Sequence, residues 1–130
     1  MSRILLVDDE PMILRIMRVT LEDRGFQIKI AHNGLQALEL VGDFEPHAVV
    51  TDIDMPKMNG RELCQKLRER YSAEDLPLFV VTSKTAVEHR AWSEQLENLH
   101  FLEKPVSLRK LCTRLEMVLQ EGRLAQECTT

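Results

Sequence analysis

The chain has 130 residues, a length typical of one domain rather than two. Its 21 acidic residues outnumber 17 basic residues and give a formal net charge of −4, whereas dedicated nucleic-acid-binding proteins usually carry an excess of basic residues. Four Phe, one Tyr and one Trp are its only aromatic residues. We therefore expect an aliphatic core, no aromatic platform for single-stranded nucleic acid, and no direct nucleic-acid partner.

The three cysteines, Cys64, Cys112 and Cys128, are odd in number and lack the spacing of a zinc site or a disulfide framework. We expect reduced thiols in a cytoplasmic protein. The apolar run near the N-terminus, Ile4–Val7, is shorter than a secretory signal or a membrane span requires. The sequence therefore predicts no membrane partner.

The chain begins with a strand and a helix. Ile4–Val7 is apolar at every position, as buried strands of parallel sheets are. Pro11 suits the first turn of a helix, and Gly25 is a typical stop. The apolar positions between them recur at helical spacing, namely Ile13, Leu14, Met17 and Leu21.

The next two strands flank a second helix. Gln27–Ala31 alternates polar and apolar residues, which indicates a less buried strand. Leu35–Val41 predicts a helix that ends near Gly42. His47–Thr51 is a third, mostly apolar strand, and Asp52 ends it.

The second half of the chain repeats this alternation. A turn-rich loop, Met55–Gly60, leads into a helix over Arg61–Arg70. Leu78–Thr82 predicts the fourth strand and Lys84–Leu96 a helix with a thinner apolar stripe. Phe101–Glu103 predicts a short fifth strand.

A last helix is indicated by the core stripe Leu108, Leu111, Leu115 and Val118. The apolar pattern ends after Leu119, so residues 120–130 are expected to be frayed or to start a linker. Five strands alternating with five helices predict a three-layer α/β domain, a doubly wound (βα)5 fold with a five-stranded parallel sheet.

Chemically active side chains follow four of these strands. Asp8 and Asp9 follow the first, Asp52 ends the third, Thr82 ends the fourth and Lys104 follows the fifth. In an open parallel sheet, ligands bind outside the carboxyl ends of the strands. Clustered carboxylates repel one another, which favours a divalent cation with oxygen ligands such as Mg²⁺. A carboxylate can also accept a phosphoryl group, which a lysine and a hydroxyl would help to stabilise.

These residues resemble the receiver domains of response regulators in two-component signalling. The resemblance runs over Arg3–Leu119 and is carried by Ile4–Pro11, Thr51–Gly60, Val80–Ser83 and Phe101–Pro105. It implies a flavodoxin-like sheet order 2-1-3-4-5, a receiver domain over residues 1–120, and a polar tail or linker start over 121–130. It also implies a phosphorylation-controlled switch rather than an enzyme with a diffusible substrate.

The resemblance assigns a role to each site residue. Asp52 would accept a phosphoryl group from a phosphohistidine of a sensor histidine kinase or histidine phosphotransfer protein. Mg²⁺ would be held by Asp8, Asp9, Asp52 and the backbone carbonyl of Asp54, and the phosphoryl group would be contacted by Thr82, Ser83 and Lys104. The Lys104–Pro105 peptide bond would be cis.

Signalling is implied to follow from movement near the site. Thr82 would move toward the phosphoryl group and Phe101 would turn inward. Output would reach a downstream effector protein through the face formed by the fourth helix, the fifth strand and the last helix, and a homodimer is left open. Asp54 and Lys84 are hypothesised to face each other and slow autodephosphorylation, the alternative being a solvated pair with little effect.

Two segments depart from the family pattern or resist assignment. Receivers usually carry a Gly-Ala pair before the fifth strand, whereas this chain has Leu96–His100, which leaves the shape of that loop open. Trp92 is interpreted as a partner contact because the apolar stripe of its helix is thin, with a place in the core as the alternative.

Three other functions share features with this sequence. Asp52-Ile53-Asp54 resembles the Asp-x-Asp of haloacid-dehalogenase-like phosphatases, but those enzymes place this motif before the paired acids. A flavodoxin-like cofactor binder would share the sheet order, yet the acids at positions 8–10 would repel a cofactor phosphate. A phosphorylation-independent scaffold would not require the acids, threonine and lysine that this chain retains.

Overall fold

A computed structural model describes residues 2–53, 55, 57–82, 92 and 96–128, with side chains described up to residue 120. Five parallel strands form one sheet in the order β2-β1-β3-β4-β5, as predicted. The strands are β1 (Arg3–Val7), β2 (Gln27–Ala31), β3 (Ala48–Asp52), β4 (Leu78–Thr82) and β5 (Leu99–Glu103).

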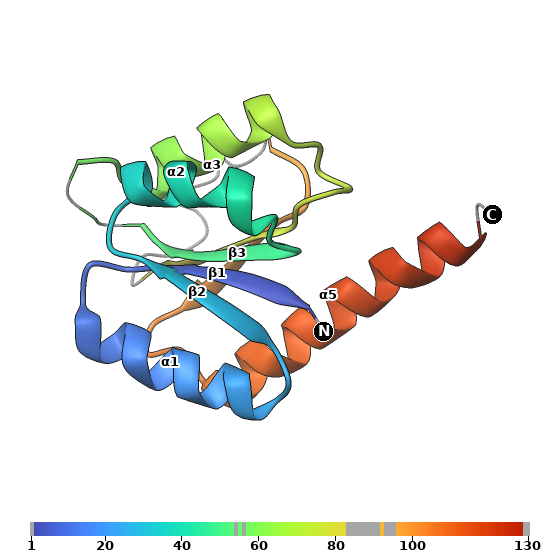
Figure 1. The fold of residues 1–130 in the computed structure, drawn as a ribbon, viewed down its shortest axis with the longest axis horizontal. Coiled ribbons are helices and arrows are strands. Elements are labelled where there is room, and N and C mark those ends of the chain that lie inside the picture. Colours follow the sequence, from blue (N-terminus) through green and yellow to red (C-terminus); the bar gives the residue numbers. More distant parts are fainter. Residues whose placement is uncertain (1, 54, 56, 83–91, 93–95, 129–130) are drawn as a thin grey trace.

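Helices cover both faces of the sheet and complete the three predicted layers (Figure 1). The described helices are α1 (Pro11–Asp23), α2 (Gly34–Phe44), α3 (Gly60–Arg70) and α5 (Leu108–Cys128). The helices α1 and α5 lie on one face, and α2 and α3 lie on the other. The helix predicted over residues 84–96 falls almost entirely outside the described residues.

The central strands are buried on both faces because helices cover both. Alternate residues of β1 enter different clusters: Leu5 and Val7 pack under α2 and α3, whereas Ile4 and Leu6 pack under α1 and α5. Every residue of β3 and β4 is buried. The apolar runs recognised in the sequence are therefore the middle of the core, since only strands covered on both faces need apolar residues at every position. Within the part of the chain described, no helix combines the length and apolar composition of a membrane span.

The ends of two helices show where local signals hold and fail. Gly25 follows α1 with a φ of 93°, a conformation that favours glycine, so the predicted stop is confirmed. The predicted stop near Gly42 is wrong, because α2 continues to Phe44 and ends where Glu45 adopts a φ of 51°. Phe44 packs against the core cluster under α2 and α3, and this contact carries the helix past the glycine.

The last helix is longer than its apolar stripe suggests. It continues beyond Leu119 to Cys128, so the backbone of residues 120–128 is helical rather than frayed. Gln, Glu, Arg, Leu and Ala in this stretch are good helix formers, which favours a helical backbone there. Figure 1 shows this end of α5 projecting past the sheet toward the C-terminus. The domain boundary placed at residue 120 stays a prediction.

Candidate functional site

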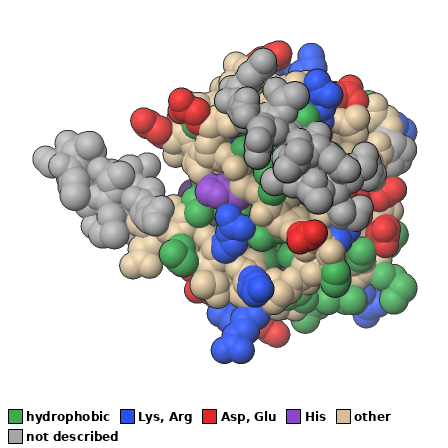
Figure 2. All heavy atoms as spheres, turned by 180° about the vertical axis from the view of Figure 1, so that it is seen from behind, with side chains coloured by type: hydrophobic (Ala, Val, Ile, Leu, Met, Phe, Trp, Pro, Cys, Tyr) green, Lys and Arg blue, Asp and Glu red, His purple; other side chains and the backbone are tan. Residues whose placement is uncertain are grey.

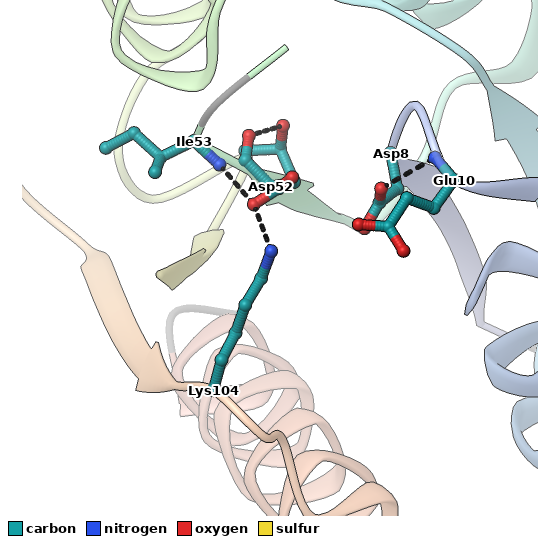
Figure 3. A network of polar contacts seen from close by, with 6 residues as sticks. Asp8, Glu10, Asp52, Ile53 and Lys104 are labelled. Carbon is teal, nitrogen blue, oxygen red and sulfur yellow. Dashed lines mark hydrogen bonds and ion pairs between the residues drawn. The ribbon is translucent and has the colours of Figure 1, made fainter. Parts of the chain in front are cut away.

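Four neighbouring strands deliver the site to one edge of the sheet. Asp8 follows β1, Asp52 ends β3, Thr82 ends β4 and Lys104 follows β5. The side chains of Asp8, Asp52 and Lys104 converge there (Figure 3). Asp8, Asp52 and Thr82 are only 5%, 4% and 2% exposed. Buried charge is unusual unless it is paired or binds a ligand. The carboxyl edge of this parallel sheet is therefore suited to bind a charged ligand.

The carboxylate of Asp52 is held by two donors. Lys104 Nζ lies 2.9 Å from Asp52 Oδ1, and the backbone N–H of Ile53 donates to the same oxygen at 2.9 Å. Burial alone would lower the pKa of Lys104, but its hydrogen bond to Asp52 and the neighbouring acids raise it overall. The ammonium therefore stays charged beside the carboxylate, which fixes the side chain of Asp52 at the mouth of the site.

Asp8 lies beside this pair, and its charged form is disfavoured. Its Oδ1 accepts the backbone N–H of Glu10 at 2.9 Å. Burial raises the pKa of Asp8 from 3.8 to about 6, and repulsion from Asp52 and Asp9 adds to the rise. A divalent cation would offset both the cost of burying this charge and the repulsion between the carboxylates.

The acidic cluster contains a residue that sequence reasoning missed. Carboxylate oxygens of Asp8, Asp9 and Glu10 all lie within 4.8 Å of one another, a spacing at which one cation could be shared. Asp9 and Glu10 are exposed, so a cation there would keep part of its water shell. The acidic run Asp8-Asp9-Glu10 is the sequence signal that identifies Glu10 as a third candidate ligand. The oxygen donor set and its repulsion fit Mg²⁺.

Backbone contacts fix the loop after Asp52. The N–H of Gly60 donates to the Ile53 carbonyl at 2.9 Å, and a Cβ at Gly60 would collide with the Asp52 carbonyl oxygen and lie 2.8 Å from Ile53 Cα. Asn59 caps α3 by accepting the N–H of Glu62 at 2.9 Å. The loop therefore folds back onto the strand end so closely that only glycine fits. Sequence reasoning placed Gly60 in a turn but did not identify it as a site residue.

The other side of the site leads from Thr82 into the core. The N–H of Lys104 donates to the Thr82 carbonyl at 2.8 Å, which joins the ends of β4 and β5. Phe101, half-buried on β5, meets the ring of Trp92 edge-on with a centroid distance of 5.8 Å. Trp92 is 7% exposed and belongs to the core cluster, so its interpretation as a surface partner contact is wrong. The few apolar residues near Trp92 in the sequence did not indicate that the ring of Phe101 on β5 would pack against it.

Some predicted features can be placed and others cannot. The Lys104–Pro105 peptide bond is cis, as the resemblance implied. The loop before β5 turns at Asn98, whose φ of 55° is tolerated by asparagine and whose Nδ2 donates to the Ala73 carbonyl at 2.7 Å. Cys64 and Cys112 are free buried thiols, as expected, and burial raises the pKa of Cys64 to about 12. Asp54, Ser83 and Lys84 lie outside the described residues.

Comparisons with known proteins agree with this geometry. The family model described as the response regulator receiver domain matches residues 4–116. Response regulator MprA of Mycobacterium ulcerans is 33% identical over 125 residues, covering 96% of this chain and 53% of that protein. MprA of Mycobacterium tuberculosis is 33% identical over 121 residues, covering 93% and 52%. The chain thus spans about half the length of these curated relatives.

Solved structures show the same likeness. A receiver domain protein described as CheY-like from Methanospirillum hungatei superposes with a TM-score of 0.84 at 26% identity, covering 96% of this chain and 98% of that one. Chemotaxis protein CheY4 of Vibrio cholerae gives 0.83 at 26% identity, covering 91% and 98%. Response regulator TrrA of Thermotoga maritima, solved with Mg²⁺ and BeF, gives 0.79 at 25% identity, covering 91% and 99%.

The family match covers most of the chain, and it favours a receiver domain over the phosphatase and cofactor-binding alternatives. The sheet order, the acidic pair after β1, the aspartate ending β3 and the lysine after β5 provide a physical basis for that match. Phosphorylation and Mg²⁺ binding are typical of such domains, and their role is signalling. We conclude that this chain belongs to the response regulator receiver domain family, the phosphorylation-activated signalling domains of two-component systems.

Proposed function

We propose that Asp52 accepts a phosphoryl group from a phosphohistidine on a sensor histidine kinase or a histidine phosphotransfer protein. An oxygen of Asp52 attacks the phosphorus, the new O–P bond forms, and the N–P bond breaks as the imidazole nitrogen takes the electron pair and then a proton from water. The observation that carries the proposal is the buried Asp52 carboxylate with Lys104 Nζ 2.9 Å away and the acidic cluster beside it.

The residues around Asp52 have separate tasks in this transfer. Lys104 holds the carboxylate before transfer and pairs with the phosphoryl oxygens afterwards. The hydroxyl of Thr82 donates to a phosphoryl oxygen, with Ser83 as a second contact. Transfer in a buried site needs this compensation because the phosphoryl group adds negative charge next to Asp8.

Mg²⁺ is the proposed cofactor. The ligands are Asp8, Asp9, Asp52 and the backbone carbonyl of Asp54, and Glu10 lies close enough to join through its carboxylate. When bound, Mg²⁺ neutralises charge on the acids and the phosphoryl oxygens. Asp8, with its pKa of about 6, is charged at neutral pH and needs no large energy to stay so once a cation is present.

Dephosphorylation is proposed to be slow and intrinsic. Water attacks phosphorus, the Asp52 carboxylate leaves, and inorganic phosphate is released. Asp54 and Lys84 are proposed to hinder the water, so Lys84→Ala should shorten the lifetime of the phosphorylated chain. Output is proposed to reach an effector through the face that contains β5 and α5, which Arg114 joins by donating from Nη1 to the Phe101 carbonyl at 3.2 Å.

A donor protein has an apolar surface to dock on. Met12, Ile16 and Val19 of α1 are 77%, 55% and 54% exposed, at positions that share one helix face. Figure 2 shows hydrophobic side chains gathered on the lower right of that view, where α1 lies. Beside them, a pocket of about 470 Å³ runs between α1 and the segment from Lys104 to Leu108. A protein presenting a phosphohistidine to Asp52 would cover this surface.

A phosphorylated donor protein and the small molecule acetyl phosphate can be compared to distinguish docking of a protein from phosphoryl transfer itself. Ile16→Ser should slow transfer from a phosphorylated donor protein and leave transfer from acetyl phosphate unchanged. Met117→Ser is the matched control, because Met117 is also 55% exposed but lies on α5. Equal transfer from the protein donor to the Ile16 variant and the control would contradict docking over α1.

The main test is incubation with acetyl phosphate and Mg²⁺ followed by intact mass spectrometry. We expect one phosphate per chain in the wild type and none in Asp52→Asn, which keeps the shape of the side chain. No gain in the wild type, or an equal gain in the variant, would contradict the proposed function.

A further inference from the structure

The first residue of α2 lies against the loop that follows Asp52. The N–H of Gly34 donates to the carbonyl of Met58 at 3.2 Å, and both residues are buried. Figure 1 shows this end of α2 beside the loop that leads from β3 to α3. The helix α2 supplies none of the proposed ligands, yet its first turn contacts the loop next to the phosphoacceptor.

Only glycine fits at position 34. A Cβ there would lie 2.6 Å from the carbonyl oxygen of Met58 and 2.7 Å from both Cβ and Cγ of Met58. The carbonyl oxygen and Cβ follow the backbone of the loop, so rotating the Met58 side chain would not remove the collision. A larger residue at position 34 must therefore displace either the start of α2 or the loop.

The start of α2 is the more firmly held of the two. Asn33 Oδ1 accepts the N–H of Gln36 at 2.9 Å, and Gln36 Oε1 accepts the N–H of His32 at 2.6 Å, so the two side chains cap the first turn reciprocally. Ala37 of the same turn is fully buried in the core cluster under α2 and α3. We therefore expect the loop to move when a side chain is added at position 34.

The loop keeps a conformation that its own residues do not favour. Lys57, the neighbour of Met58, has a φ of 67°, in the left-handed region that lysine rarely adopts. Such a backbone persists where surrounding contacts impose it. Two contacts hold this loop, namely the hydrogen bond from Gly34 to Met58 and the bond from the Gly60 N–H to the Ile53 carbonyl at 2.9 Å. The shape of the loop thus depends on α2 as well as on β3.

We propose that Gly34 positions the loop after Asp52 for Mg²⁺ binding. The inference rests on the proposed function, in which the backbone carbonyl of Asp54 in this loop is a ligand. Gly34 acts through Met58 and is a positioning residue rather than a ligand. Because it has no side chain, the loop can lie against α2 and offer its carbonyl to a cation held by the carboxylates of Asp8 and Asp52.

Adding a methyl group at position 34 should therefore weaken Mg²⁺ binding. Residues that orient a metal ligand without touching the metal typically change affinity by about ten- to hundredfold. Because one ligand of several is disturbed, we expect Gly34→Ala to raise the apparent Kd for Mg²⁺ about tenfold. Phosphate gain from acetyl phosphate should then need about tenfold more Mg²⁺ and reach the wild-type level at saturation.

The first experiment measures urea unfolding at increasing Mg²⁺ concentration and constant ionic strength, because the rise in stability gives the apparent Kd without any phosphorylation. Gly42→Ala is the matched control, since it adds the same methyl group to α2 where, in the described part of the chain, no atom beyond its own helix turn lies within 4 Å. It should keep the wild-type Kd.

A second control separates Mg²⁺ affinity from stability. Arg68→Ala removes a side chain that donates to the Leu76 carbonyl at the amino end of the sheet, so it should lower stability and leave the Kd for Mg²⁺ unchanged. A wild-type Kd in folded Gly34→Ala, whatever its loss of stability, would overturn the inference.

The second experiment uses the wild type alone, so it remains decisive if Gly34→Ala does not fold. If the loop contact and Mg²⁺ binding are coupled, bound Mg²⁺ strengthens the contact in return. Hydrogen exchange of the Gly34 N–H, followed by NMR, should slow about fivefold or more on addition of Mg²⁺. The Gln27 N–H, which donates to the Ser2 carbonyl at 2.8 Å at the amino end of the sheet, is the reference for general stabilisation. Equal slowing of the two amides would contradict the coupling.

The wild type distinguishes this inference from the proposed function. A wild type that binds Mg²⁺ and gains phosphate, with the same Kd in Gly34→Ala, overturns the positioning role of Gly34 and leaves the phosphoacceptor role standing. A wild type that neither binds Mg²⁺ nor gains phosphate overturns both.

Discussion

The two ends of the parallel sheet differ in what their polar groups do. At the carboxyl end, Asp8 and Asp52 are buried near each other, with Lys104 as the cation that pairs with Asp52. At the amino end, charged and polar side chains bind backbone carbonyl and N–H groups instead. Arg68 of α3 donates to the Leu76 carbonyl at 2.7 Å and to loop carbonyls before β5.

The amino end is built to hold the fold together. Arg68 reaches the Glu97 carbonyl from Nη2 at 2.8 Å and the Asn98 carbonyl at 3.2 Å, so one guanidinium ties α3 to the starts of two strands. Near β1, Arg3 Nε donates to the Glu45 carbonyl at 2.8 Å, and the Arg3 N–H donates to His47 Nδ1 at 2.8 Å. These contacts tie the loops at this end to the helices and strands beside them.

The carboxyl end keeps charge that the folded chain does not neutralise by itself. Burial and the neighbouring acids both disfavour the charged form of Asp8 and raise its pKa. A site of this kind lowers the stability of the empty domain and in return is ready for a cation and a phosphoryl group. We therefore expect that removing the charge of Asp8 raises stability, whereas removing Arg68 at the amino end lowers stability and leaves phosphorylation unchanged.

The largest effect is expected at the close approach behind Asp52. Gly60→Ala should lower the free energy of unfolding by roughly 2–4 kcal/mol, because the added methyl group meets backbone atoms that cannot move aside, and it should reduce phosphate gain. Urea unfolding and intact mass measure both effects. Gly42→Ala is the control, since nothing lies within 4 Å of its Cβ position on α2, and it should stabilise by up to about 1 kcal/mol. Equal stabilities of the two variants would contradict the close approach.

An intermediate effect is expected at the amino end. Arg68→Ala should lower the free energy of unfolding by about 2–3 kcal/mol, because three carbonyls lose charged donors, while phosphate gain by the folded protein stays unchanged. Arg68→Lys should recover only part of the lost stability, since one ammonium group cannot replace the several N–H donors of the planar guanidinium. Arg18→Ala, which breaks an exposed pair with Glu22, should change stability by no more than about 0.5 kcal/mol. A loss of phosphate gain in folded Arg68→Ala would show that the two ends are not separate.

The smallest effect has the opposite sign. Because the folded pKa of Asp8 lies above its ordinary value of 3.8, the folded chain binds more protons between pH 3.8 and about 6, and stability falls as pH rises through this window. Without divalent cations at pH 7.5, Asp8→Asn should therefore raise the free energy of unfolding by about 1–2 kcal/mol. The amide oxygen can still accept the Glu10 N–H.

The stability of Asp8→Asn should also be compared with that of the wild type at acid pH and in the presence of Mg²⁺. Below about pH 4 the stabilisation should vanish, because Asp8 is then protonated in the wild type. Added Mg²⁺ should stabilise the wild type and much less the variant. A variant less stable than the wild type at pH 7.5 without metal would contradict the strained carboxylate.

The positions of residues at the strand ends were predictable from the sequence. The apolar runs of β1, β3 and β4 placed Asp8, Asp52 and Thr82 at strand ends, and parallel topology then brought those ends together. Lys104 followed from the same logic, and its contact with Asp52 agrees with it. Strand periodicity and chain order were sufficient for these assignments.

Residues whose role depends on packing across the fold were not predictable. The burial of Trp92 could be predicted only from the position of Phe101, with which its ring packs. The steric requirement for glycine at position 60 could be predicted only from the return of the loop onto β3. The hydrogen bonds of Arg68 join three segments far apart in sequence. In α2, tertiary contact at Phe44 outweighed the local signal of Gly42. Each case turns on a long-range contact that local pattern does not contain.

The central claim is that Asp52, and no other carboxylate of the cluster, carries the phosphoryl group. The chain is treated with acetyl phosphate and Mg²⁺, the acyl phosphate is reduced with borohydride to the corresponding alcohol, and peptides are sequenced by mass spectrometry. The account predicts homoserine at position 52 alone, dependent on acetyl phosphate. Reduction at Asp8, Asp9 or Glu10 with position 52 unmodified would contradict it.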